Sequence, residues 1–164
     1  MPNAYYHGEQ HWRRVGRIGS HLLSSVDSAD PLVIFLFALF HDSMRLNEGR
    51  DPGHGVRGRG LGMDLIPNYL EVSDLQLAAF KHACDHHTDG EVTTDPTIAV
   101  CWDSDRLDLW RVGSTPSPRF MSTPLAGQEE TIQWSHSILE IEPPGWRELA
   151  DQVAERMRTK SRNA

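Results

Sequence analysis

Histidine and aspartate side chains occur at three places where their types and spacing suit a metal ion. His7 and His11 are four residues apart, so a helix would present both imidazoles on one face. His41 and Asp42 are adjacent at the end of a long apolar stretch, where a buried imidazole or carboxylate is costly unless it is paired or bound to a metal. Asp105 lies in another stretch with many apolar residues. Together these positions predict a buried metal site.

Further histidines lie between these groups in the sequence. His54 falls in a glycine-rich segment, and His82, His86 and His87 fall within a single predicted helix. Nitrogen and carboxylate ligands without thiolates suit Mn, Fe, Co, Zn or Mg. A carboxylate can bridge two such ions, which together polarise a phosphoryl group and lower the pKa of a bound water. We therefore expect a divalent metal cofactor of one or two ions.

Helices are predicted to position all of these residues. The segment from Leu32 to about Met44 is apolar on nearly all sides, and it should form a helix through the core with Asp30 as its N-cap and Pro31 at its first position. Apolar residues at three- and four-residue spacing predict the other helices. These cover His7–Val26, a segment from Leu61 to Ile66 that ends before Pro67, Leu75–His87, Pro96–Leu109 and Gly145–Arg158.

Two segments are predicted to be irregular. Leu46–Gly60 is rich in turn-forming residues, and its glycines weaken any helix that starts there. Val112–Gln128 contains three prolines and should run over the surface. Because no alternating strand pattern is present, we expect an all-α fold, with a single domain over residues 1–158 and a disordered tail at residues 159–164.

Charge and cysteine content argue against several classes of protein. The formal net charge is −7, and a chain this acidic repels phosphate backbones, which argues against general nucleic-acid binding. Two cysteines are too few for a disulfide scaffold, so we expect a reduced, cytoplasmic setting.

The longest apolar run, Leu32–Phe40, is too short to span a bilayer, and the N-terminal residues lack the pattern of a signal peptide. We therefore expect no membrane partner.

The ordered series His11, His41-Asp42 and Asp105 resembles the HD domain superfamily of metal-dependent phosphohydrolases. Two flanking motifs are similar as well. The sequence His11-Trp12-Arg13-Arg14-Val15 resembles the His-x-x-Arg-Val motif of the family, and Ala99–Leu107 resembles its final Ala-Asp-Arg-Leu type motif. The resemblance covers about two thirds of the chain, from Tyr6 to Leu109. It implies a compact HD-domain helical bundle with a metal site in its core.

The resemblance also implies which residues bind metal. Bimetallic branches of the family add two histidines between the His-Asp pair and the last aspartate, and His54 and His87 occur in that order. The Gly-Tyr-Pro signature of one branch is absent, as is the Glu-Asp pair of alarmone hydrolases, so neither of those activities is implied. The implied metal ligands are His11, His41, Asp42, His54, His87 and Asp105, and His7 and His86 are further candidates for a metal or substrate contact.

The activity implied by the resemblance is hydrolysis of a phosphomonoester or phosphodiester. The substrate would be an anionic small molecule, and nucleotides are the class that the family suggests. Asp42 would bind metal and orient the attacking water, while Arg45 or Arg50 would neutralise substrate charge. Two alternatives fit the same ligand order: a mixed-valent di-iron oxygenase of the HD type, and a non-catalytic metal-bound interaction module.

Two aspartates compete for the last ligand position. Asp103 and Asp105 are two residues apart, so a regular helix points them about 200° away from one another and only one can face the site. Asp105 has apolar residues at offsets of three and four, and it is followed by Arg106-Leu107 as in the family motif. We therefore expect Asp105 to be the ligand, and Asp103 to form a surface ion pair with Arg106.

Overall fold

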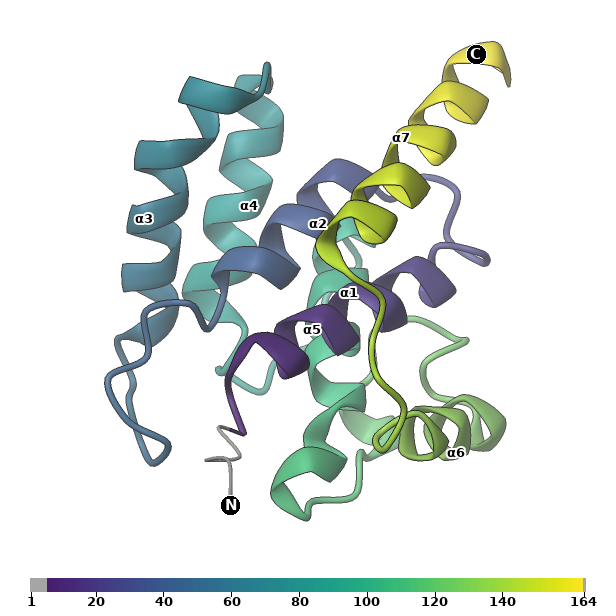
Figure 1. Ribbon diagram of the computed structural model, residues 1–164. Coiled ribbons are helices and arrows are strands. Elements are labelled where there is room, and N and C mark those ends of the chain that lie inside the picture. The colour runs from purple at the N-terminus through teal and green to yellow at the C-terminus, as the bar shows by residue number, and fades with distance from the viewer. Residues whose placement is uncertain (1–5, 164) are drawn as a thin grey trace.

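The computed structural model describes residues 6–163, and within them every regular element is a helix (Figure 1). The predicted all-α fold is confirmed. None of the described helices is both long enough and apolar enough to cross a membrane. The α-helices are α1 (Glu9–Leu22), α2 (Pro31–Phe40), α3 (His54–Tyr69), α4 (Asp74–His86), α5 (Pro96–Leu107), α6 (Glu129–Ser137) and α7 (Trp146–Asn163), with short 3-10 helices η1 (Leu109–Val112) and η2 (Pro118–Phe120).

The two central helices begin with the same capping device. Asp30 accepts hydrogen bonds from the first free backbone N–H groups of α2, and Pro31 occupies the first helical position, where its missing N–H costs nothing. Asp95 and Pro96 do the same for α5. Such caps stabilise a helix by about 1 kcal/mol. They fix where each helix starts, and so which of its residues reach the interior.

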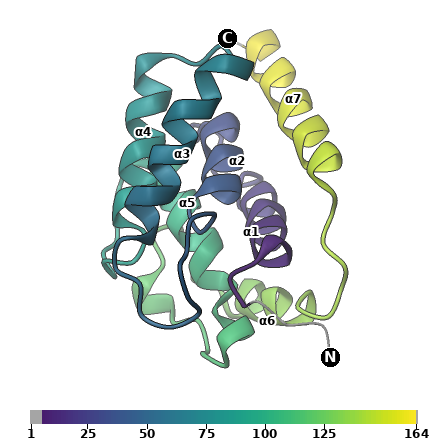
Figure 2. The same cartoon turned by 60° about the vertical axis from the view of Figure 1, so that its left-hand side comes forward.

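Helix α2 runs through the middle of the bundle. It packs against α1, α3, α4, α5 and α7. Figure 2 shows α3 and α4 on one side of α1 and α2, and α7 on the other. Val33, Leu36 and Phe37 of α2 are completely or almost completely buried. The prediction that this apolar helix crosses the core is confirmed, and His41-Asp42 directly after it are buried too.

Helix α3 corrects the prediction that Leu46–Gly60 is a loop throughout. The helix begins at His54, so the last part of that segment is helical, and it continues through Pro67 to Tyr69. Two of its glycines permit close contact between backbones. A Cβ atom on Gly58 would lie 2.1 Å from the carbonyl oxygen of Phe40, and one on Gly55 would lie 2.2 Å from that of Cys84. These glycines therefore allow α3 to pack closely against α2 and α4.

Other helix boundaries also differ from the sequence expectations. Helix α1 ends at Leu22 rather than Val26, and α6 occupies residues for which no element was expected. Helix α7 continues to Asn163, so residues 159–163 are helical rather than the frayed tail we expected. Side chains of α7 donate hydrogen bonds to the α1–α2 connection, where Arg156 and Lys160 contact backbone carbonyl oxygens. These bonds hold the far end of α7 in place.

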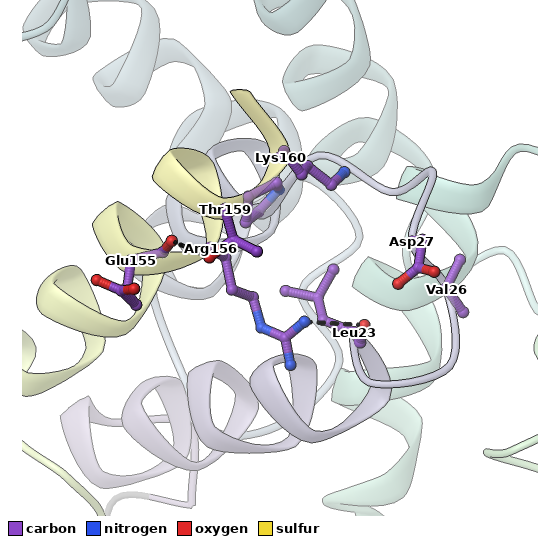
Figure 3. Close-up of a pocket in the computed structure, with 8 residues that line it drawn as sticks. Leu23, Val26, Asp27, Glu155, Arg156, Thr159 and Lys160 are labelled. Atoms are coloured by element: carbon purple, nitrogen blue, oxygen red, sulfur yellow. Dashed lines mark hydrogen bonds between the residues drawn. The ribbon is translucent and has the colours of Figure 1, made fainter. Parts of the chain in front are cut away.

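A cavity of 610 Å³ lies between α7 and the α1–α2 connection (Figure 3). Its lining mixes apolar side chains such as Leu23 and Val26 with charged ones such as Arg156, which is already bonded to a backbone carbonyl of α1. None of the histidines or aspartates predicted to bind metal lines it. The candidate chemistry therefore lies elsewhere in the bundle.

Candidate metal centre

Five segments of the bundle bring the six predicted metal ligands together in its interior. All six are at most 9% exposed. Three groups of histidines and aspartates have ligand atoms within 4.8 Å of one another, which is the arrangement needed to hold a metal ion. The six are His11 on α1, His41 and Asp42 directly after α2, His54 at the start of α3, His87 at the end of α4, and Asp105 on α5.

In each of the four histidines among the six candidate ligands, Nδ1 lies within hydrogen-bond distance of an oxygen acceptor, while Nε2 points toward the centre of the cluster. Carboxylate and carbonyl oxygens only accept hydrogen bonds, so each Nδ1 must carry the proton. In a neutral imidazole the lone pair is then on Nε2, the nitrogen available to a metal. The Nδ1 contacts are His11 to Asp108 Oδ2 at 2.7 Å, His41 to Phe37 O at 3.0 Å, His54 to Asp51 O at 2.5 Å, and His87 to Cys84 O at 2.8 Å.

The inner nitrogens of these histidines face one another in two pairs. Nε2 of His11 is 3.1 Å from Nε2 of His41, and Nε2 of His54 is 2.8 Å from Nε2 of His87. Two lone pairs this close repel unless a cation lies between them. Around an octahedral ion with bonds of about 2.1 Å, neighbouring ligand atoms are about 3 Å apart. Each histidine pair therefore has the spacing of two ligands on a common ion.

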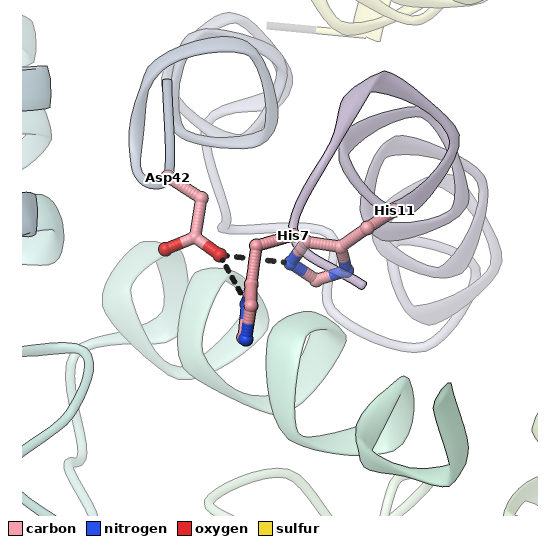
Figure 4. A group of neighbouring side chains, drawn as sticks. All are labelled: His7, His11 and Asp42. Atoms are coloured by element: carbon pink, nitrogen blue, oxygen red, sulfur yellow. Dashed lines mark hydrogen bonds and ion pairs between the residues drawn. The ribbon is translucent and has the colours of Figure 1, made fainter. Parts of the chain in front are cut away.

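Asp42 lies between the two histidine pairs and faces each with a different oxygen. Its Oδ2 is 3.0 Å from Nδ1 of His7 and 3.5 Å from Nε2 of His11, and Figure 4 shows both imidazoles directed at this carboxylate. Its Oδ1 is 2.9 Å from Nε2 of His54 and 3.7 Å from Nε2 of His87. A carboxylate placed in this way has the arrangement of a bridge between two ions.

Asp105 completes the group that contains His11 and His41. Its Oδ1 is 3.4 Å from Nε2 of His11 and 3.8 Å from Nε2 of His41. Within the described residues this buried oxygen has no hydrogen-bond partner, and the nearest cation, on Arg111, is 3.5 Å away. A buried carboxylate oxygen without a hydrogen bond is costly. The donor set and this orphaned oxygen both fit a metal ion.

Their buried surroundings shift the pKa values of four candidate ligands. Burial lowers the pKa of His41 to about 3, so its imidazole is neutral. Burial alone raises the pKa of Asp42 and of Asp105. For Asp42 the neighbouring imidazoles more than offset this and the pKa falls, and for Asp105 the Arg111 and imidazole charges lower it to about 2. Burial is the largest single influence on His87 and lowers its pKa, but the Asp42 and Asp105 carboxylates and the Cys84 carbonyl together outweigh burial, so the net shift is upward.

Asp108 is a functional candidate that the sequence analysis missed. It is fully buried, and its carboxylate accepts hydrogen bonds from Nδ1 of His11 and from two nitrogens of Arg14, at 2.7 and 3.1 Å. The hydrogen bond fixes the ring of His11, and Arg14 in turn fixes Asp108. The signal was present, because Asp108 is three residues after Asp105 and a helix turn puts both on one face.

His7 and His86 lie in different surroundings. Helix α1 begins at Glu9, so His7 lies in the turn before it, where its backbone carbonyl accepts a hydrogen bond from the Trp12 indole. It still reaches Asp42. His86 is exposed, pairs with Asp89 at 2.7 Å, and belongs to none of the three groups. The structure thus brings His7, but not His86, to the other candidate ligands.

Arg45 and Arg50, the two arginines predicted to neutralise substrate charge, differ in their contacts with the candidate ligands. Nη1 of Arg45 is 3.5 Å from Asp42 Oδ1, and its Nη2 donates to the carbonyl of Gly49 at 2.7 Å. Arg50 is exposed and forms no ion pair with a candidate ligand in the described part of the chain, although it lines a neighbouring hollow together with Arg45 and His54. Arg111, which the sequence analysis did not single out, contacts both Asp105 and His7.

Asp103 corrects the prediction of a surface ion pair. Its side chain is completely buried, and its two oxygens accept hydrogen bonds from the backbone N–H groups of Ser122 and Thr123 at 2.8 and 2.7 Å. Burial raises its pKa, although these bonds act against the rise. The expectation failed because the segment after α5 folds back over this face of the helix. Asp103 is therefore an anchor for that segment.

A cavity of 440 Å³ opens onto the cluster. Small-molecule sites are typically about 300–1,000 Å³. Its lining includes candidate ligands, apolar side chains and three arginines. Among the lining residues, the candidate ligands are His7, Asp42, His54, His87 and Asp105, the apolar residues are Leu109, Phe120 and Met121, and the arginines are Arg45, Arg106 and Arg111.

Comparisons with known proteins leave this geometry as the basis for any functional inference. No protein family, curated protein or solved structure matches the chain. The argument for an activity therefore depends on the buried histidine and aspartate groups, the bridging position of Asp42, and the cavity beside them.

Proposed function

We propose that this protein is a metal-dependent phosphohydrolase of the HD type that acts on a small phosphomonoester or phosphodiester. The observation that carries the proposal is the position of Asp42. Its two oxygens face two separate pairs of histidines at the edge of a cavity lined by arginines. A two-ion centre beside a cationic cavity suits an anionic substrate whose phosphoryl group is to be hydrolysed.

In this proposal the ligands divide into two sets that share Asp42. One set is His11, His41 and Asp105, and the other is His54 and His87. The absence of thiolates from both sets favours Mn, Fe, Co, Zn or Mg. When bound, such ions act as Lewis acids toward phosphoryl oxygens and make a bound water acidic enough to attack at neutral pH.

The remaining side chains position the ligands and the substrate. Asp108 holds the ring of His11, and backbone carbonyls hold the rings of the other three histidines, so these four imidazoles do not have to reorient when an ion binds. Arg45 and Arg111 lie beside Asp42 and Asp105 and line the cavity, where their guanidinium groups can bind phosphate oxygens. They would also balance the negative charge of the substrate.

The test begins with full-length protein purified without chelator and analysed for metal. Phosphate release is then measured for a panel of phosphomonoesters, phosphodiesters and nucleotides with Mn, Co, Zn or Mg. We expect turnover of at least one class, loss of turnover in Asp42→Asn, and normal turnover in His82→Ala, a histidine outside the cluster. Metal-loaded protein that turns over none of these esters would refute the proposal.

The oxygenase alternative has the same ligand types, and the same preparation distinguishes it. Iron in the purified protein, an EPR signal from an Fe(II)/Fe(III) pair and oxygen consumption would replace phosphohydrolase by oxygenase chemistry. Bound metal with neither activity would favour the non-catalytic module.

A further inference from the structure

Arg106 is buried beside the cavity with one nitrogen that has no partner. The residue is 7% exposed and follows Asp105 on α5. Its Nη1 donates to the carbonyl oxygen of Phe120 at 2.7 Å, and its guanidinium lies 5.5 Å from the centre of the Trp102 ring. Within residues 6–163, its Nη2 has no hydrogen-bond partner. A buried charged donor left unpaired is costly, so the position calls for an acceptor.

The nearby carboxylates do not supply that acceptor. Asp103 and Asp105 are close enough to influence Arg106 electrostatically, but neither forms an ion pair with it in the described part of the chain. Both oxygens of Asp103 are taken by the backbone N–H groups of Ser122 and Thr123. Asp105 faces the histidines.

Arg106 differs in this respect from the other two cationic side chains of the cavity. Arg45 and Arg111 each lie 3.5 Å from a carboxylate of the candidate metal centre. Arg106 instead donates to the backbone carbonyl of Phe120, on the segment that also supplies apolar side chains to the cavity lining. The cavity lining thus includes one arginine, Arg106, that is not paired with a carboxylate of the candidate metal centre.

We propose that Arg106 binds a carboxylate on the far end of the substrate, while the reacting phosphate lies at the Asp42 centre. This inference rests on the proposed function for the reacting end only. A carboxylate is favoured over a second phosphate because Asp103 and Asp105 lie nearby, and they repel a dianion more strongly than a monoanion. The substrate class is therefore a small phosphate ester that also carries a carboxylate.

Pairs of phosphonates that differ by one group test this directly. Isothermal titration of the full chain loaded with Mn²⁺ compares phosphonoacetate with ethylphosphonate, and phosphonopropionate with propylphosphonate. Within each pair a carboxylate replaces a methyl group, and the two chain lengths allow for the unknown distance. We expect the carboxylate to tighten binding in at least one pair by about tenfold or more, as for a hydrogen bond between charged groups.

Substitutions test whether a preference for the carboxylate arises from Arg106 or from direct binding of the carboxylate to the metal ion. Arg106→Gln should abolish the preference and leave the affinity for inorganic phosphate within about twofold, whereas Arg147→Gln, at an exposed position on α7, should keep both. Arg106→Lys, which retains a charge, should keep part of the preference and guards against misfolding of the glutamine variant. A preference that survives in Arg106→Gln, or equal affinities in both pairs for the wild type, would overturn the proposal.

The outcome is independent of the hydrolase assay. An Arg106-dependent preference in a protein that hydrolyses no phosphate ester would refute the proposed function and leave this binding site in place. Hydrolysis of a phosphate ester without an Arg106-dependent preference would support the proposed function and refute the proposed carboxylate site.

Discussion

Asp103 and Asp105 are two residues apart on α5, and both are buried, but their oxygens have different partners. Asp105 Oδ1 faces the imidazoles of His11 and His41 without a hydrogen bond, while Asp103 accepts hydrogen bonds from two backbone N–H groups of the segment that follows α5. The first arrangement fits a metal ligand, and the second fits a structural anchor. Exchanging each carboxylate for an amide should therefore have separate effects.

We predict that Asp105→Asn loses bound metal, because an amide lacks the negative charge of a ligand carboxylate. Asp103→Asn should keep its metal but unfold more easily, by about 1–3 kcal/mol, because the amide NH₂ would face a backbone donor. Metal analysis and denaturant unfolding of the two variants, measured together, check both statements. Metal loss confined to Asp103→Asn would show that the ligand has been assigned to the wrong aspartate.

The histidines at the end of α4 offer a second pair of neighbours with different surroundings. His87 is buried and faces His54 and Asp42, whereas His86 is exposed and paired with Asp89. We predict that His87→Ala and His54→Ala each reduce the metal content from about two ions per chain to about one. His86→Ala should leave it unchanged. Equal metal content in all three variants, measured by elemental analysis, would argue against a second ion.

At the scale of elements, α3 depends on glycines that allow another backbone to approach. Gly58 lies against the carbonyl oxygen of Phe40, next to His41 and Asp42. We predict that Gly58→Ala destabilises the protein by about 1–3 kcal/mol, because the new methyl group must displace backbone rather than a flexible side chain. Because this backbone continues into the candidate ligands His41 and Asp42, we also expect weaker metal binding.

Gly60 is the matched control on the same helix. A Cβ atom there meets nothing within 4 Å, so Gly60→Ala should gain only helix propensity and stabilise the protein by about 0.5–1 kcal/mol. Denaturant midpoints of the two alanine variants should shift in opposite directions. A similar shift for both would mean that α3 does not approach α2 as closely as described.

At the scale of the whole molecule, the candidate ligands connect helices that are distant in the sequence. They come from α1, the turn after α2, α3, the end of α4, and α5. A bound ion therefore cross-links most of the bundle. Because the unfolded chain cannot gather these ligands, metal at about 100 times its dissociation constant should stabilise the fold by about 2.7 kcal/mol.

We predict that removing metal with a chelator lowers the Tm by about 5–10 °C, and that adding a divalent ion restores it. The control is Asp42→Asn, which lacks the carboxylate shared by both ligand sets, so its Tm should respond less to both treatments. Thermal unfolding followed by circular dichroism makes the measurement. A wild-type Tm that is insensitive to both chelator and metal would contradict a cross-linking role for the ion.

Local chemistry in the sequence predicted the fold class and four of the candidate ligands, and the family resemblance added His54 and His87. Apolar periodicity identified most of the helices, and the Asp30-Pro31 cap located the start of α2. His11, His41-Asp42 and Asp105 could be selected because polar residues at the inner positions of apolar helices are costly without partners. The structure brings all of them, with His54 and His87, into one buried cluster. These are properties of short segments, which a linear sequence shows directly.

Only the tertiary structure decided what surrounds those residues. The burial of Asp103 and the unpaired nitrogen of Arg106 both depend on the segment around Phe120 to Thr123, which folds back over α5. The contacts of Asp42 with two histidine pairs, and the close approach of Gly58 to the Phe40 carbonyl, likewise depend on groups from other helices. Helical periodicity says which side of a helix is apolar, but it contains no information about which distant segment will cover that side.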